Sequence, residues 1–256
     1  IKEIFLRIGL EAFQVSILVK DYDRFAKEAQ AICKDRVYTD RLRRYAYGVD
    51  ASCYSYLPKV VVKAENESEV RRLIRLCQQC GTPFTFRAAG SSLSGQCSSE
   101  DVLIVCNDGF KKMEVIDDGK ALRCECGVIG SDANDLLKPY NRKIGPDPAT
   151  LATALVGGIL NNNSSGMCCG TAQNSYKTIR SIRVVLLDGS ILDTSDKKSI
   201  DQFLKEKAQM VEDILQLRKE ILADEELTHL IHHKYKIKNT TGYGLNSLVD
   251  FEDIID

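Results

Sequence analysis

Residues 87–96 (Arg-Ala-Ala-Gly-Ser-Ser-Leu-Ser-Gly-Gln) constrain the fold more than any other stretch of the sequence. Their two glycines, three serines and two alanines cannot fill a hydrophobic core, and they follow a strand-like run at residues 83–86. A loop of this composition can bring backbone N–H groups close to an anion, so its expected ligand is a phosphate. The alternative is an ordinary polar surface loop, and this stretch alone leaves both open.

Two common phosphate-binding motifs do not fit this loop. The spacing of Gly90 and Gly95 is that of a Walker A loop, but Gln96 and Cys97 stand where its Lys and its Ser or Thr are required. The glycines also lack the G-x-G-x-x-G order of a Rossmann motif. The sequence therefore favours a different kind of anion-binding loop.

A second glycine-rich block spans residues 145–166 (GPDPATLATALVGGILNNNSSG). Its two prolines rigidify the entry, while the glycine pair and the three consecutive asparagines allow close backbone approach and many amide hydrogen bonds. Two loops of this kind in one small domain are not expected by chance. Together they favour a bound anionic ligand over a plain surface loop.

Composition limits the class of protein. The 256 residues suffice for one large domain or two small lobes, and a hydrophobic content of 44% with a net charge of -1 is typical of a globular protein with no general affinity for nucleic acid or anionic membranes. No apolar run is long enough to span a membrane, and residues 1–4 lack the layout of a signal peptide. We expect a cytoplasmic protein without membrane insertion of its own; the alternative is one bound peripherally at the inner face of a membrane, through a partner.

Ten cysteines are present, some of them in pairs at Cys77/Cys80, Cys124/Cys126 and Cys168/Cys169. Cys77 falls in phase with the apolar face of a predicted helix, which favours a small core residue. Cys124 and Cys126 share one face of a strand-like segment, which also suits burial. Reduced thiols are expected, and no metal site is predicted.

The apolar patterns predict a mixed succession of helices and strands. Residues 1–34 have helical periodicity, whereas residues 36–52 are polar and aromatic with no clear period. Strands are expected at 59–63, 83–87, 101–106, 112–116 and 121–126, and helices at 69–79, capped by Asn66 or Ser68 and Gly81, and at 132–138, capped by Ser131. A hairpin over 181–187 and 190–193 and one long amphipathic helix at 196–224 complete the pattern.

At these positions the sequence resembles the FAD-binding domain of the vanillyl-alcohol-oxidase superfamily (PCMH type). Within it, the sequence is most similar to FAD-linked D-2-hydroxyacid dehydrogenases of D-lactate, glycolate and D-2-hydroxyglutarate. The resemblance covers nearly the whole chain and rests on residues 50–52 with Pro58, 87–96, 145–148, 157–166 and 238–246.

The fold that this resemblance implies is α+β, with two lobes and FAD between them. The implied boundaries are a helical N-terminal lead-in at 1–57, a first α/β lobe at 58–130, and a second α+β lobe at 131–256 that is truncated at its C-terminal end. The chain stops before the glycine-rich segment that closes such domains. It also lacks the cap domain and the iron–sulfur domain of some relatives, so we expect a fragment, with any iron–sulfur cluster in the missing part.

The resemblance also implies the residues around the cofactor. The implied FAD-binding residues are Pro58, Arg87, Ala88, Ala89, Gly90, Ser91, Ser92, Ser94, Gly95, Pro146, Asp147, Thr150, Gly157, Gly158, Asn162, Ser165, Gly166 and, through its backbone at the adenine end, Ile182. On the substrate side it implies Lys236, Lys238 and Thr241, although the lysines equally suit a solvated charged strand. No catalytic base is assigned, and the three histidines at 229, 232 and 233 are expected on a helix surface.

The implied reaction is oxidation of a D-2-hydroxyacid to the 2-oxoacid by hydride transfer to flavin N5, with an electron acceptor that the sequence does not identify. Many relatives attach the flavin to a His in or near the first loop. Here those positions hold Ala, Gly and Ser, so non-covalent FAD is expected. The alternatives are a non-catalytic nucleotide-binding module and a sugar-nucleotide reductase of the same fold.

Overall fold

The computed structural model describes residues 20–239 and 244–256, which form two compact units. Among these residues, the N-terminal unit comprises 20–180 and 185–190, and the C-terminal unit comprises 181–184, 191–239 and 244–256. The beginning of the predicted helical lead-in, residues 1–19, lies outside the described residues. No helix in the described part of the chain combines the length and the apolar character that a membrane crossing requires.

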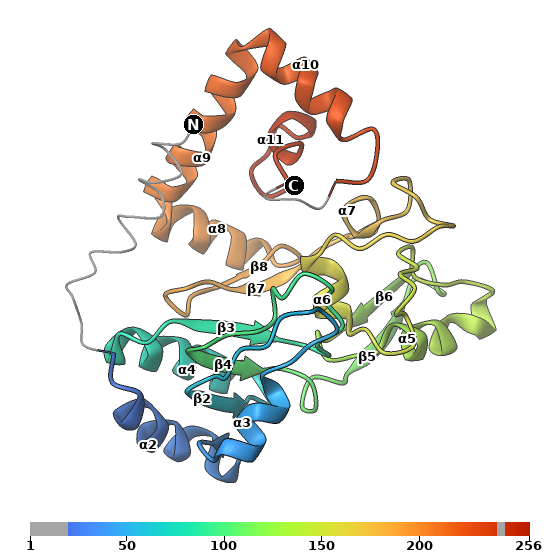
Figure 1. The fold of residues 1–256 in the computed structure, drawn as a ribbon. Coiled ribbons are helices and arrows are strands. Elements are labelled where there is room, and N and C mark those ends of the chain that lie inside the picture. The colour runs from blue at the N-terminus through green and yellow to red at the C-terminus, as the bar shows by residue number, and fades with distance from the viewer. Residues whose placement is uncertain (1–19, 240–243) are drawn as a thin grey trace. The chain divides into compact units, whose positions relative to one another are not determined.

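A four-stranded sheet forms the centre of the N-terminal unit (Figure 1). Its strands are β1 (Val37–Tyr38), β2 (Val60–Lys63), β3 (Phe84–Arg87) and β4 (Val102–Val105), in the order β1-β2-β4-β3. Strand β4 runs parallel to both of its neighbours, and Val105 is in register with Lys63 on one side and with Arg87 on the other. The carboxyl ends of three strands therefore meet at one edge, where open parallel sheets bind ligands.

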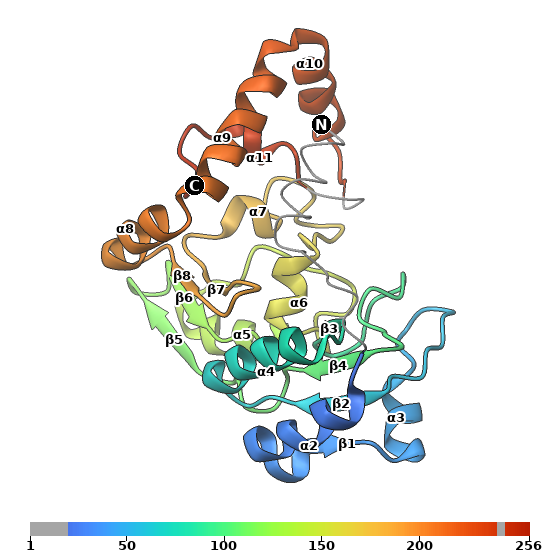
Figure 2. The same cartoon turned by 90° about the vertical axis from the view of Figure 1, so that its left-hand side faces the viewer.

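Both faces of this sheet are covered, which explains the unbroken apolar runs in β2 and β4. On one face, Val62 and Ile104 pack with α2 (Tyr22–Cys33) and α4 (Glu67–Cys80), two helices that contact each other and are labelled in Figures 1 and 2. On the other face, Val61 and Leu103 pack with tyrosines of β1 and α3. Helix α4 begins at the predicted cap Asn66, whose side chain accepts from Glu69 N, and it ends at Gly81, where φ is +64°.

One segment is more regular than its sequence indicates. Residues 36–52 show no clear period, yet they contain β1, part of the 3-10 turn Lys34–Arg36, and helix α3 (Arg41–Tyr47). The side chain of Asp40 caps α3 by accepting from Arg43 N. Because α3 is only two turns long, its apolar positions cannot establish a helical period in the sequence.

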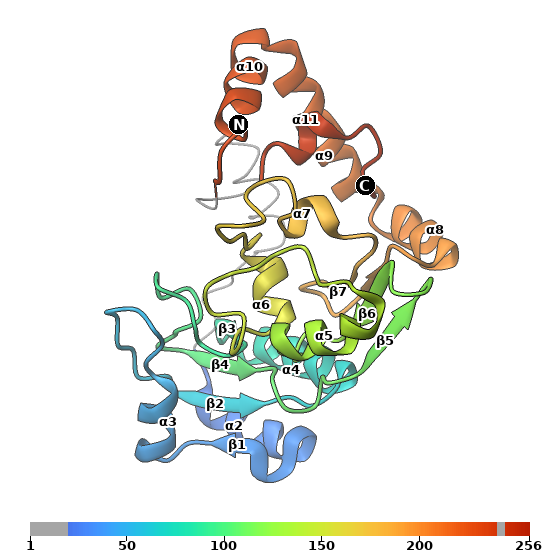
Figure 3. The same ribbon diagram turned by 90° about the vertical axis from the view of Figure 1, so that its right-hand side faces the viewer.

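The rest of the N-terminal unit contains a hairpin and several short helices. The predicted strands β5 (Met113–Ile116) and β6 (Ala121–Cys124) pair through a turn in which Asp117 and Asp118 both have φ of +51°. The helices are α5 (Gly130–Leu137), the 3-10 turn η2 (Lys138–Tyr140), α6 (Val156–Asn161) and α7 (Ser175–Thr178), which Figure 3 shows from another side. The predicted cap at Ser131 is wrong, because α5 already begins at Gly130, with Ile129 at the N-cap.

The C-terminal unit is mainly helical. It contains a hairpin in which β7 (Arg183–Val185) pairs with β8 (Ile191–Asp193). The last residue of β7, Val185, is counted with the N-terminal unit. The predicted single helix at 196–224 is instead α8 (Lys197–Glu206) and α9 (Ala208–Ala223), separated at Lys207, where φ is -112° and ψ is 29°. The two parts pack on different partners, α8 on β8 and α9 on α10 (Glu225–Lys234) and α11 (Ser247–Asp250), so packing overrides the continuous helical pattern.

Candidate functional site

The predicted phosphate loop leaves the sheet at the carboxyl end of β3. Gly90 has φ of +78° and Gly95 has φ of +76°, a backbone region that favours glycine. The N–H groups of Ala89, Gly90 and Ser91 donate no hydrogen bond to any other described residue. Donors that are left free in such a turn are the groups that an anion can use.

Arg87 supplies a positive charge at the base of the loop. Its Nη1 donates to the carbonyl of Tyr47 over 3.1 Å, and its guanidinium lies 5.9 Å from the centre of the Tyr47 ring. A β-carbon added to Gly90 would lie 2.2 Å from Arg87 Nη2, so the side chain folds back beneath Gly90. The loop therefore combines unused N–H groups with one nearby cation.

A segment that the sequence did not assign to the site, residues 48–56, packs on this loop. Ala51 N donates to Gly90 O over 3.0 Å, and Tyr56 N donates to Gly48 O over 2.8 Å. The ring of Tyr54 lies against Gly95, where a β-carbon would be 2.8 Å from the ring. No sequence signal places these residues together, because the segment has no period and its partners lie about 40 positions later.

The carboxylate of Asp50 joins the same segment to the end of the loop. It accepts from Ser52 N at 2.8 Å, from the Ser52 hydroxyl, and from Cys97 Sγ at 3.3 Å. Burial is the largest influence and raises the pKa of Asp50, but hydrogen bonds from Ser52 and Cys97 outweigh it and leave this pKa below its ordinary value. Burial, together with Asp50, raises the pKa of the Cys97 thiol.

The second glycine-rich block meets the first through Gly158. A β-carbon on Gly158, in α6, would lie 3.6 Å from Ala88 Cβ. Its neighbour Gly157 faces elsewhere, because a β-carbon there would lie 2.6 Å from Cys126 Cβ. The two adjacent glycines thus have different roles, one beside the candidate loop and one at a close internal packing contact.

The same block folds back on itself around Asp147, which follows the buried Pro146. A β-carbon on Gly166 would lie 1.9 Å from Asp147 O, so only glycine fits there. Cys169 N donates to Asp147 Oδ1 over 3.1 Å, and a hydrogen bond from the Cys169 thiol is the main reason why the pKa of Asp147 is lowered. Cys169 was not predicted for this role.

The other predicted cofactor-binding residues, in both glycine-rich segments and at Pro58, range from buried to exposed. Asn162 Nδ2 donates to Ser164 Oγ over 3.4 Å, and Ser165 is buried. Thr150 is exposed and its carbonyl closes a turn, accepting from Ala154 N over 2.7 Å. Within the first loop, Ser94 N donates to Ser92 Oγ, and Pro58 is buried with its carbonyl bound by Arg44.

Three predicted positions that the structure describes belong to the C-terminal unit. The backbone N–H and carbonyl of Ile182 both bond to Thr194, through Oγ1 and N respectively, each over 2.9 Å. Lys236 and Lys238 are exposed, and Thr241 lies outside the described residues. The three histidines are exposed on α10, as expected for a helix surface.

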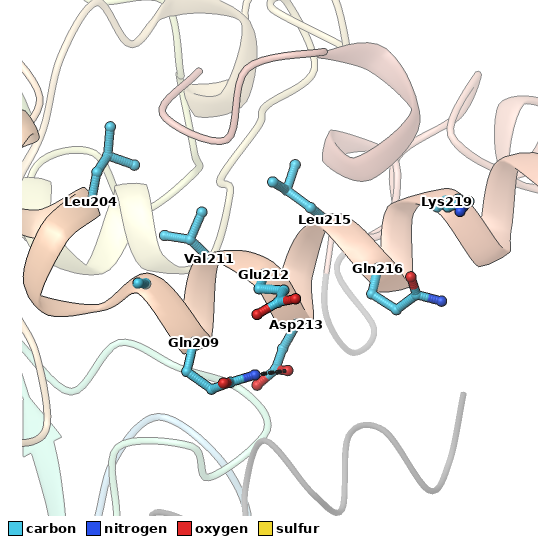
Figure 4. Close-up of a pocket in the computed structure, with 9 residues that line it drawn as sticks. Leu204, Gln209, Val211, Glu212, Asp213, Leu215, Gln216 and Lys219 are labelled. Atoms are coloured by element: carbon cyan, nitrogen blue, oxygen red, sulfur yellow. Dashed lines mark hydrogen bonds between the residues drawn. The ribbon is translucent and has the colours of Figure 1, made fainter.

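The described residues offer no second candidate centre. Within residues 20–239 and 244–256, no group of three His, Cys, Asp or Glu side chains could hold a metal ion. A pocket of about 520 Å³ lies along α8 and α9, lined by Leu204, Val211 and Leu215 together with polar side chains (Figure 4). None of the residues predicted to contact FAD or substrate lines it.

Comparisons with known proteins point to an FAD-binding domain. A family model described as FAD binding domain matches residues 58–195, more than half of the chain. D-2-hydroxyglutarate dehydrogenase of Escherichia coli K12 is 30% identical over 161 residues, which cover 61% of this chain and 16% of the relative. Glycolate oxidase subunit GlcD of Bacillus subtilis 168 is 27% identical, over 62% of this chain and 34% of the relative. The chain thus spans between a sixth and a third of these relatives' length.

Solved structures agree on the fold. Alkyldihydroxyacetonephosphate synthase superposes with a TM-score of 0.57 at 21% identity, covering 68% of this chain and 38% of that one. At this level of identity the similarity is evidence of fold alone. Together with p-cresol methylhydroxylase (PCMH), which superposes with a TM-score of 0.56 at 17% identity over 67% of this chain and 35% of that one, it confirms the α+β fold of the PCMH type that the sequence predicts.

Proposed function

Since the chain belongs to the FAD binding domain family, we propose that its N-terminal unit holds FAD without a covalent bond, as part of a dehydrogenase of D-2-hydroxyacids. The contact of Gly158 with Ala88 carries this proposal, because it unites the two glycine-rich segments. The predicted arrangement of two lobes, with boundaries at residues 58 and 131 and FAD between them, remains part of the proposal.

The residues fit an FAD diphosphate in three respects. Free N–H groups at Ala89, Gly90 and Ser91 suit phosphate oxygens, and the Arg87 guanidinium lies beside them. The bare α-carbon of Gly158 leaves room next to Ala88. Asp147 and Gly166 would border the flavin side of the cofactor.

The nearby thiol of Cys97 supports a non-covalent cofactor. Attachment would need a reactive thiolate, but burial and the neighbouring carboxylate of Asp50 raise the pKa of Cys97, the thiol that directly follows the first segment. The Cys97 thiol is also bound to Asp50, so it acts as a hydrogen-bond donor rather than as a nucleophile.

The chemistry would be divided between the cofactor and this chain. When bound, FAD supplies the acceptor for the hydride that leaves the α-carbon of the hydroxyacid. The residues of this unit bind and orient the diphosphate. Lys236, Lys238 and Thr241 stay proposals for the substrate side, and a small 2-hydroxyacid is the proposed substrate.

A titration with flavins tests the proposal. Added FAD should lose fluorescence on binding, whereas FMN, which lacks the diphosphate-linked adenylate, should bind at least about tenfold more weakly. Acid precipitation of the loaded protein should release all flavin to the supernatant. A pellet that stays yellow would refute non-covalent binding, and equal affinity for ADP and FAD would favour a general nucleotide-binding module.

A further inference from the structure

Two neighbouring residues hold both ends of the predicted diphosphate loop. Ala51 N donates to Gly90 O over 3.0 Å, near the beginning of the loop. Asp50 Oδ2 accepts from Cys97 Sγ over 3.3 Å, directly after its end. Because Asp50 and Ala51 are consecutive, the stretch from Gly90 to Cys97 is closed onto one point of the chain.

The carboxylate of Asp50 is itself fixed before it meets the thiol. Its Oδ1 accepts from both the N–H and the hydroxyl of Ser52, so the side chain has little rotational freedom. The other oxygen, Oδ2, then faces Cys97. Ionised carboxylates only accept hydrogen bonds, and the three donors here make Asp50 a rigid anchor.

We propose that Asp50 and Cys97 form a clasp that positions the diphosphate loop, and that Cys97 is a positioning residue for FAD. This inference rests on the proposed function of the same loop. A flexible loop loses conformational entropy when it binds a ligand, and this loss weakens binding. A loop that is already ordered in the free protein avoids this loss. Opening the clasp should therefore weaken FAD binding about tenfold, the size expected from one hydrogen bond to a charged group.

Variants of the two partners test the clasp with FAD. Cys97→Ala and Asp50→Asn should each weaken FAD binding about tenfold, and the double variant should be no weaker than either, because both remove the same contact. Cys97→Ser keeps a donor and should recover part of the affinity. The matched control is Cys53→Ala, since the Cys53 thiol is exposed and hydrogen-bonds to no other described residue.

Thiol alkylation tests the clasp without FAD. Iodoacetamide labelling, followed peptide by peptide by mass spectrometry, should be slower at Cys97 than at Cys53. Asp50→Asn should accelerate labelling of Cys97 at least about fivefold and leave Cys53 unchanged, because the thiol loses its acceptor and becomes more acidic. Unchanged labelling of Cys97, or additive losses in the double variant, would overturn the clasp. Failure of the unmodified chain to bind FAD would count against the proposed function instead.

Discussion

Gly158 faces the methyl group of Ala88: a β-carbon added to Gly158 would lie 3.6 Å from Ala88 Cβ, an ordinary contact distance. Ala88 follows β3 and Gly158 lies in α6, so this contact joins segments 70 residues apart. A methyl group fits at this point, whereas a longer side chain would occupy the space beside the loop. The pair therefore gives a graded probe of the candidate site.

Gly158→Ala should bind FAD within about twofold of the unmodified chain, whereas Gly158→Leu should bind it at least about 30-fold more weakly. The reason is steric, because the leucine branch would extend past Ala88 into the space proposed for the cofactor. FAD fluorescence quenching measures both affinities. Equal affinity of the two variants would remove Gly158 from the binding site.

The adjacent Gly157 should respond in the opposite way to the same substitution. Gly157→Ala introduces a β-carbon 2.6 Å from Cys126 Cβ and 3.1 Å from the Cys126 carbonyl oxygen, so it should destabilise the fold by about 1–3 kcal/mol. Gly158→Ala is the matched control and should change the stability by less than about 0.5 kcal/mol. Urea denaturation measures the free energy of unfolding of the two variants, provided that their m-values are equal.

Gly90→Val should abolish measurable FAD binding. Valine is strained at φ of +78°, and its β-carbon would displace the Arg87 guanidinium. Gly189→Val is the control, because Gly189 lies in a different loop and its φ is +76°. The atom nearest to a β-carbon at Gly189 belongs to the flexible side chain of Arg75 in α4. The Gly189→Val variant should have a similar backbone strain and keep its FAD affinity. Undiminished FAD binding by Gly90→Val would show that the loop at 87–96 is not part of the FAD site.

The ion pair of Glu69 with Arg36 should make stability depend on pH in the acid range. Arg36 Nη1 and Nη2 donate to the two carboxylate oxygens over 2.9 and 2.8 Å, and only 13% of the Glu69 side chain is exposed. Hydrogen bonds from Arg36 are the main cause that lowers the pKa of Glu69 from 4.5 to about 2. A lowered pKa stabilises the folded state above pH 4.5, and this contribution is lost as the pH falls from 4.5 toward 2.

Glu69→Gln should therefore reduce the free energy of unfolding by about 2–3 kcal/mol at pH 7 and by much less at pH 2.5. Urea denaturation at the two pH values measures the difference. Glu67→Gln, in the same turn of α4, controls for loss of a negative charge near the start of the helix. A Glu69→Gln penalty that stayed constant from pH 7 to pH 2.5 would contradict the predicted linkage.

The chain alone should not turn over any 2-hydroxyacid. Hydride transfer needs a base within hydrogen-bond reach of the substrate, and the sequence assigns none. The histidines at 229, 232 and 233 are exposed on α10. A dye-reduction assay with added FAD and D-lactate, glycolate or D-2-hydroxyglutarate should stay at background. Steady turnover would mean that a catalytic base lies within these 256 residues.

Local signals were enough to predict strands β2, β3 and β4 of the sheet and its main helix, α4. Asn66 and Gly81 mark the ends of α4, and the β-branched run at 60–62 marks a buried strand, because caps and hydrophobic periods act over a few residues. The two glycine-rich segments were also evident from their glycine, serine and asparagine content. Their chemical identity came from resemblance to a family rather than from the residues alone.

Long-range contacts were not accessible to the same reasoning. Asp50 and Cys97 are 47 residues apart, and neither position has a pattern that singles out the other. The break at Lys207 has no glycine or proline to announce it, and it follows from the different packing partners of α8 and α9. Sequence periodicity describes one element at a time, so contacts between elements lie beyond it.

The strand order also sets an order of assembly during synthesis. Strand β4 lies between β2 and β3 in space but follows both in the chain, so the ribosome releases these two neighbours before the strand that separates them. Until residues 102–105 have emerged, β2 and β3 have only each other as parallel partners, an arrangement that the native sheet excludes. The loop at 88–101 must then carry β4 back between them. Cotranslational chaperones would accordingly meet this chain with its strand edges exposed at this stage.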